Sequence, residues 1–124
     1  MIRETRDREE IASVMRHYPQ FAGADDQVKD RCRYFVAERN GEIVGLVFFD
    51  HLENKVWRGH FLMLPAGMGR GVLYARQALK AMSDTADRVI GMTPIENTKA
   101  LRAAFAVGMR YAARTEEFHV TEYP

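Results

Sequence analysis

The stretch Pro65-Ala66-Gly67-Met68-Gly69-Arg70-Gly71-Val72-Leu73 places three glycines between a β-prone run, residues 56–64, and an amphipathic one, residues 72–85. Apolar residues recur every three or four positions in the second run, which predicts a helix, and Pro65 ends the strand before it. A glycine loop between a strand and a helix exposes unpaired amides beside the positive end of the helix dipole. The stretch therefore predicts an α/β unit able to bind an anion such as a phosphate.

The glycine spacing excludes two common phosphate-binding motifs. A P-loop needs Gly-Lys-Ser/Thr, and a dinucleotide fingerprint needs an acid roughly 20 residues on. Asp84 and Asp87 fall inside or after the predicted helix, so neither serves. Arg70 adds a cation for a charge-assisted contact. A loop that is merely flexible remains the alternative interpretation.

Towards the amino terminus, the pattern predicts one helix and a hairpin. Residues 2–4 form a short strand, and Thr5 or Asp7 caps a helix that ends before Pro19. Residues 19–32 predict a loop with one further short helix. Asn40-Gly41 is a two-residue turn signal between β-prone runs at 34–37 and 43–49.

Towards the carboxyl terminus, residues 88–92 predict a buried strand. Asn97 caps a second helix and Gly108 ends it. Two strand candidates, 110–114 and 118–123, follow. Hairpins in the middle and helical crossovers on either side give an α/β (α+β) class, with a mixed, mostly antiparallel central sheet flanked by helices.

Composition fits one soluble domain spanning residues 1–124. The chain is 47% hydrophobic and 28% charged with a net charge of +1, so we expect no nucleic-acid partner, which would need a patch of one sign. Its amino terminus lacks a secretory core, no apolar run approaches about 20 residues, and Cys32 has no disulfide partner. These features predict a cytoplasmic protein without membrane contact.

Three segments together resemble the GNAT N-acetyltransferase superfamily. Residues 61–65 followed by Gly69-Arg70-Gly71-Val72 resemble its central signature: strand, proline, Gly-x-Gly turn, helix. Residues 94–100 with Gly108-Met109 resemble the second signature, Asn-x-x-Ala followed by Gly-Phe. The hairpin at 36–45 is similar to the family's opening strands. The resemblance implies the acyl-CoA N-acyltransferase fold.

The resemblance also implies acetyl-CoA as cosubstrate and a primary amine as acceptor, either a small molecule or a protein. In the family, the strand before the loop pairs with the pantetheine arm, the loop amides hold the pyrophosphate, and the asparagine lies beside the thioester. The implied cofactor-binding residues of this chain are Phe61, Leu62, Met63, Met68, Gly69, Arg70, Gly71, Val72, Leu73 and Asn97. Residues 18–33 correspond to the acceptor side, and family habit implies a homodimer.

This sequence departs from the family pattern at three positions. Met68 stands where Arg or Gln is usual, Leu73 where a small residue is usual, and Ala104 where a tyrosine often protonates the leaving thiolate. Loss of an acid catalyst costs a factor of roughly 10²–10⁴. A second hypothesis is therefore a catalytically degenerate binding or assembly protein, similar to short GNAT-like proteins encoded by phages.

Two side chains are the candidate catalytic groups. His60 precedes the loop on its strand, and a histidine side chain is the ordinary general base near neutral pH; a structural histidine is the alternative. Tyr111, just past the second helix, is a replacement proton donor or a packing residue. The four histidines and Cys32 lack metal-ligand spacings, so we expect no metal site.

Overall fold

The computed structural model describes residues 1–21 and 28–124. It contains a seven-stranded sheet in the order β1-β2-β3-β4-β5-β7-β6, with three α-helices and two 3₁₀ turns. Along the chain the elements are β1 (Ile2–Thr5), α1 (Arg8–Met15), η1 (Pro19–Phe21), β2 (Cys32–Arg39), β3 (Glu42–Glu53), β4 (Val56–Met63), η2 (Pro65–Gly67), α2 (Gly71–Ala81), β5 (Arg88–Pro94), α3 (Thr98–Val107), β6 (Arg110–Arg114) and β7 (Phe118–Tyr123).

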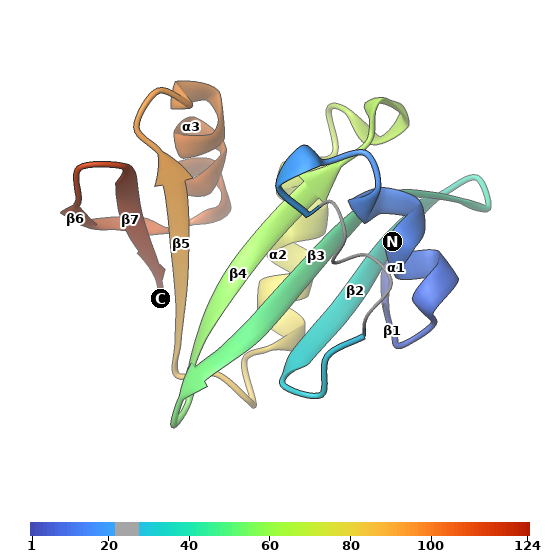
Figure 1. Ribbon diagram of the computed structural model, residues 1–124, viewed down its shortest axis with the longest axis horizontal. Helices are drawn as coiled ribbons and strands as arrows, with labels where there is room; N and C mark the ends of the chain where they lie inside the picture. Colours follow the sequence, from blue (N-terminus) through green and yellow to red (C-terminus); the bar gives the residue numbers. More distant parts are fainter. Residues whose placement is uncertain (22–27) are drawn as a thin grey trace.

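The sheet is mixed and mostly antiparallel, as the sequence predicts. Only the β4–β5 pair is parallel, because α2 carries the chain back across the sheet between them. The helix α1 covers one face of β1–β4, and α2 covers the other (Figure 1). Strand β5, the helix α3 and the β6–β7 hairpin form a second part beside them. The predicted α/β class is confirmed.

Alternation along the central strands divides the core between the two faces. Phe49 and Trp57 pack under α2, with Ala78 and Leu79 of that helix. The residues that face α1 lie at the intervening strand positions: Tyr34, Val36, Leu46, Phe48 and Leu62. Both faces of the central strands are therefore buried, which explains why their sequence reads as nearly continuous apolar runs.

Both predicted long helices end earlier than their periodicity suggested. The helix α2 runs over Gly71–Ala81 instead of reaching residue 85, because Met82 caps it and Ala86 N donates to Met82 O in a closing turn. The helix α1 ends at Met15, before the predicted stop at Pro19, which instead opens η1. The remainder of the loop predicted at 19–32 lies partly outside the described residues.

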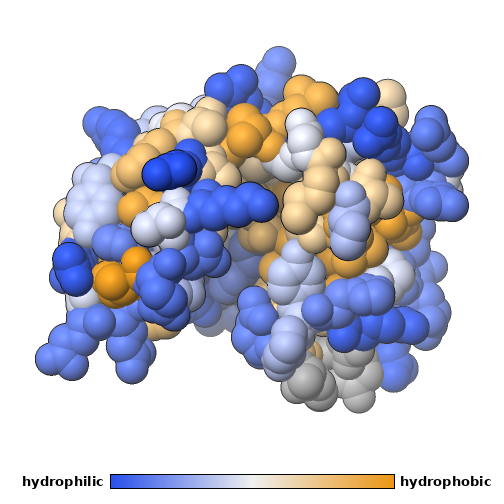
Figure 2. Space-filling model, turned by 90° about the horizontal axis from the view of Figure 1, so that it is seen from above, coloured by the Kyte–Doolittle hydropathy of each residue, from blue (hydrophilic) through white to orange (hydrophobic). Residues whose placement is uncertain are grey.

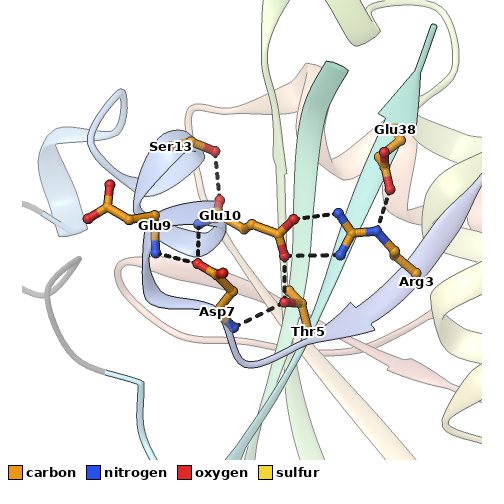
Figure 3. A network of polar contacts seen from close by, with 7 residues as sticks. All are labelled: Arg3, Thr5, Asp7, Glu9, Glu10, Ser13 and Glu38. Atoms are coloured by element: carbon orange, nitrogen blue, oxygen red, sulfur yellow. Dashed lines mark hydrogen bonds and ion pairs between the residues drawn. The ribbon is translucent and has the colours of Figure 1, made fainter. Parts of the chain in front are cut away.

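A polar network joins the start of α1 to the first two strands (Figure 3). Asp7 caps the helix by accepting from Glu9 N at 2.9 Å and Glu10 N at 3.2 Å. The carboxylate of Glu10 accepts from both terminal nitrogens of Arg3, at 3.0 and 2.5 Å, and Arg3 also donates to Glu38 of β2. These bonds fix the orientation of α1 over the sheet.

Candidate functional site

The strands β4 and β5 pair over three residues and then separate. Their register joins Val56, Trp57 and Arg58 to the first three residues of β5, and no pair is formed beyond Arg58 and Ile90. Figure 1 shows the two strands diverging above this joint. Residues 59–63 of β4 therefore present a backbone edge that no strand of the described residues covers, which is an opening for a ligand that pairs with main-chain groups.

The glycine loop follows β4 at this open end. Pro65–Gly67 forms a 3₁₀ turn, and Gly69 has φ +88°, a left-handed conformation that glycine adopts freely. The helix α2 then begins at Gly71 without a side-chain cap. Four amide groups have no hydrogen-bond partner among residues 1–21 and 28–124: those of Gly69, Gly71, Val72 and Leu73. The sequence predicts a phosphate site at these amides, and amides exposed at the start of a helix are groups to which anions bind.

Exposed apolar side chains come from the elements beside the opening. Phe61 of β4 and Met92 of β5 are 37% and 40% exposed, and Leu73 at the start of α2 is 46% exposed. Figure 2 looks at the molecule from the end towards which β4 and β5 diverge, and shows a hollow with apolar groups on its rim. An apolar edge beside four free amides suits a ligand with both an aliphatic and an anionic part.

The helix α3 buries its apolar face only partly: Ala100, Leu101 and Ala104 are half-buried and Phe105 is exposed. Its sequence predicts an apolar face at Ala100, Leu101, Ala104 and Phe105, yet only Val107 of this helix is buried. Phe105 is 44% exposed. The side chain of Asn97 accepts from Ala100 N at 3.1 Å, so this residue caps α3 as predicted.

Tyr18 occupies the outward backbone groups of Met63 at the end of β4. Its hydroxyl donates to Met63 O at 2.6 Å and accepts from Met63 N at 2.8 Å. These groups point away from β3, which pairs instead with Leu64 N through Val44 O. Of the three predicted pantetheine-contacting residues, Leu62 has its side chain in the core under α1, 4% exposed.

His60 lies on the α1 side of β4, where it meets Asp50 of β3. Its Nε2 is 2.7 Å from Asp50 Oδ1, and its ring stacks on Phe48 with 4.4 Å between centroids. Arg58 Nη2 donates to the other carboxylate oxygen at 2.9 Å. Burial raises the pKa of the Asp50 carboxyl, but the bonds from His60 and Arg58 outweigh burial and hold that pKa below its usual value. An ionised Asp50 fixes the tautomer of neutral His60 with the proton on Nε2, which leaves Nδ1 as acceptor.

Asp50, Arg58 and His60 line a pocket of about 310 Å³ on the α1 face. Phe21 of η1 meets the edge of Phe48 at 5.5 Å and of His60 at 6.0 Å. Lys29 and Arg31, which lead into β2, also line it. We call this cavity the basic pocket; its charged and imidazole lining is Lys29, Arg31, Asp50, His51, Arg58 and His60.

Tyr111 lies away from this pocket. It belongs to β6, three positions from β4 in the sheet, and its ring is tilted 6.5 Å from Phe105. Its hydroxyl is 2.8 Å from His119 Nδ1, and His119 Nε2 is 3.3 Å from Ile95 O. Because a carbonyl only accepts, neutral His119 carries its proton on Nε2 and Tyr111 donates to Nδ1. The two predicted catalytic side chains are not brought together.

Within residues 1–21 and 28–124, no three His, Cys, Asp or Glu side chains gather as metal ligands would. Of the helices described, none has the length and apolarity to cross a membrane.

This arrangement of sheet, opening and glycine loop is the fold of the GNAT acetyltransferases. A Bacillus subtilis acetyltransferase in complex with CoA superposes with a TM-score of 0.81 at 12% identity, covering 98% of this chain and 95% of that one. The Campylobacter jejuni N-acetyltransferase PseH in complex with acetyl coenzyme A gives 0.77 at 14%, covering 99% and 98%. A Vibrio cholerae spermidine N-acetyltransferase in complex with CoA and spermine gives 0.69 at 12%, covering 99% and 94%.

No protein-family model matches the chain, and no curated protein matches its sequence. At 12–14% identity these likenesses show the fold, and the predicted acyl-CoA N-acyltransferase fold is confirmed.

Sequence reasoning missed two residues of the site. Asp50 was not singled out because its contact with His60 depends on the β3–β4 register, in which Asp50 pairs with Arg58. The available signal was the spacing of two residues between Phe48 and Asp50 on one strand of a hairpin and between Arg58 and His60 on the other, which places all four side chains on one face. Tyr18 lies at the start of the predicted acceptor side, residues 18–33, and its bond to Met63 spans 45 residues without a local signature.

Proposed function

We propose that this protein is an N-acetyltransferase that transfers an acetyl group from acetyl-CoA to a primary amine. The observation that carries the proposal is the joint of three residue pairs between β4 and β5, with the uncapped glycine loop directly after β4. The structural relatives holding CoA or acetyl coenzyme A support the same cosubstrate.

The residues present fit the coenzyme in two ways. A Cβ built at Gly69 meets nothing within 4 Å, and one at Gly71 meets only Met63 Cε at 3.7 Å, so the loop is open on its ligand side. The four free amides bind the pyrophosphate and Arg70 adds a cation. The β4 edge at Phe61, and at Met63 where the arm displaces the hydroxyl of Tyr18, pairs with the amides of the pantetheine arm, and Asn97 lies near its thioester end.

Transfer requires an unprotonated amine held against the thioester carbonyl. The amine nitrogen attacks the carbonyl carbon, the C–S bond breaks, and the proton that the acylated nitrogen loses passes through water to the leaving thiolate. His60 Nδ1 accepts the ammonium proton, because Nε2 is held by Asp50. Asp50 is a positioning residue in this scheme, and orientation of the amine supplies the rest of the acceleration. Tyr111, bonded to His119, takes no part.

Calorimetric titration with acetyl-CoA tests the donor site. We expect saturable binding that Gly71→Trp abolishes, since the new side chain fills the loop. Ala81→Trp, exposed at the other end of the same helix, is the matched control and keeps wild-type affinity. Absence of binding at about millimolar ligand would overturn the proposal.

Release of free thiol with a panel of amines tests the chemistry. His60→Ala lowers turnover, and Asp50→Asn alters the pH profile by freeing the His60 tautomer. A rate unchanged in His60→Ala removes this histidine from the mechanism.

A second candidate function is a non-catalytic binding or assembly protein with this fold. It is favoured by Met68, 57% exposed where an Arg or Gln is usual, and by Ala104 at the tyrosine position. This candidate predicts binding of the coenzyme without turnover, or no binding at all, so the two assays separate it from the enzyme.

A further inference from the structure

We infer that the acceptor of this protein is an anionic amine, a molecule that carries a carboxylate or phosphate a few bonds from its primary amine, and that the basic pocket binds it. That this amine is the acceptor of a reaction rests on the proposed function. That the pocket binds it is argued from the residues of the pocket alone.

The charge of the lining is the first argument. Among the described residues that line the cavity, Lys29, Arg31 and Arg58 are permanent cations and Asp50 is the one carboxylate. A concave surface lined by one sign of charge concentrates ligands of the other sign. A polyamine, with a cation at each end, meets net repulsion here. The spermine-bound Vibrio relative therefore does not indicate the acceptor of this chain.

The state of the one carboxylate is the second argument. Asp50 already accepts from Arg58 Nη2 at 2.9 Å and from His60 Nε2 at 2.7 Å. Its two oxygens are thus committed to neighbours in the sheet. The charge of Arg58 is largely offset by this pair, which leaves Lys29 and Arg31 as the cations that act on a ligand.

The positions of these groups determine how the ligand is oriented in the pocket. Arg31 lies at the β2 side of the cavity, where its Nη2 is 3.3 Å from His51 Nδ1 and 3.4 Å from Leu52 O. His60 lies on β4, next to the strand edge that faces the opening. An anionic group between Lys29 and Arg31 directs the amine towards His60.

Aromatic rings line the pocket between the Lys29–Arg31 side and His60. Phe48 stacks on His60 at 4.4 Å and on Tyr34 at 5.7 Å, and Phe21 meets Phe48 edge-on at 5.5 Å. A short aliphatic linker packs against these rings, whereas a rigid extended polar chain does not. A volume of about 310 Å³ suits a compact molecule of this kind.

The test compares two nearly isosteric amines, 4-aminobutyrate and putrescine, which differ by a carboxylate in place of the second ammonium. Each is titrated into the free protein and into the protein saturated with CoA, and amide chemical shifts report binding. O-phosphoethanolamine is a third probe, which distinguishes phosphate from carboxylate as the preferred anion.

We expect 4-aminobutyrate or O-phosphoethanolamine to bind at least about tenfold more tightly than putrescine, with shifts confined to the pocket. Lys29→Met and Arg31→Met each reduce this preference several-fold. Lys80→Met, an exposed lysine on α2, leaves it unchanged. Thermal unfolding of each variant confirms that it remains folded.

Equal or tighter binding of putrescine overturns the inference, as does a failure of both anionic amines to bind. If the protein binds an anionic amine but does not bind CoA, the proposed function is refuted and the pocket assignment stands. Turnover of putrescine but not of 4-aminobutyrate supports the proposed function and overturns the inference of an anionic acceptor.

Discussion

The hydroxyl of Tyr18 donates to the carbonyl of Met63 and accepts from the amide of the same residue, across 45 positions of sequence. One side-chain group thus satisfies both backbone groups at the open end of β4. In the proposed function, these are groups that the pantetheine arm needs. Tyr18 is therefore a competitor, within the chain itself, for the donor edge.

Replacing Tyr18 with Phe removes this competitor. We expect the Kd for CoA to fall about three- to tenfold, since a hydrogen bond contributes about 0.5–1.5 kcal/mol net. Stability falls by a similar amount. Tyr111→Phe, which loses a hydroxyl bonded to His119, leaves the Kd unchanged as the control. Weaker CoA binding in Tyr18→Phe instead shows that the hydroxyl holds β4 in its binding conformation.

Gly69→Ala distinguishes loop geometry from general stability. Gly69 has φ +88° and Gly41 has φ +80°, and a Cβ at either meets nothing within 4 Å. Each alanine substitution therefore costs about 1 kcal/mol through backbone conformation alone. Calorimetry will show at least a tenfold loss of CoA affinity in Gly69→Ala only, because Gly41 lies in the β2–β3 turn. An equal loss in both variants argues against the loop.

The unequal burial of two apolar residues of α3 predicts unequal effects on stability. Val107→Ala, in the core at 8% exposure, lowers the free energy of unfolding by about 1–3 kcal/mol. Phe105→Ala, at 44% exposure, changes stability by less than about 0.5 kcal/mol.

The same Phe105→Ala variant weakens CoA binding about fivefold. This follows if the ligand covers roughly 40 Å² of the ring at about 25 cal/mol per Å². Denaturant melts and calorimetry measure the two quantities. Unchanged affinity in this variant means that something other than the coenzyme covers α3.

Glu10 makes stability depend on acid pH. Hydrogen bonds from Arg3, then from Thr5, lower the pKa of its carboxyl from 4.5 to about 2. A carboxyl whose pKa is lower in the folded protein stabilises it fully above pH 4.5 and loses this contribution as pH falls towards 2. Because the pair is partly exposed, its contribution is under about 1 kcal/mol.

Urea melts of wild-type protein and Glu10→Gln measure this effect. Their difference in unfolding free energy is expected to shrink between pH 5 and pH 2. Glu9→Gln, whose carboxylate is 85% exposed and 3.8 Å from Arg16, shows no such trend. A difference for Glu10→Gln that is constant with pH means that the ion pair has no stabilising charge term.

Local chemistry made much of the fold predictable. The Asn40-Gly41 signal gives the β2–β3 turn, with φ of 54° and 80°, and Gly108 ends α3 with φ 109°. Each of these features depends on a backbone conformation that few residues adopt, so the sequence reveals it. The glycine loop belongs to the same category.

The candidate site was less predictable because its contacts depend on register and on distant packing. The bond between Asp50 and His60 exists because the β3–β4 pairing shifts between His51 and Glu53, close to the turn. Periodicity predicted the apolar face of α3 correctly. It carries no information on whether another element of the chain covers that face, and Phe105 remains exposed.

The joint of three residue pairs between β4 and β5 has a consequence for how the molecule opens. The last third of the chain is joined to the rest by this short ladder, by the bond from Arg76 to Ala106 O, and by Val89 and Val107 in the core under α2. Because the ladder is so short, we expect the amides of β5–β7 to exchange with solvent through an opening that leaves β1–β4 intact. A ligand that bridges the joint opposes this opening, so slowed exchange in β5–β7 reports occupancy without any assay of chemistry.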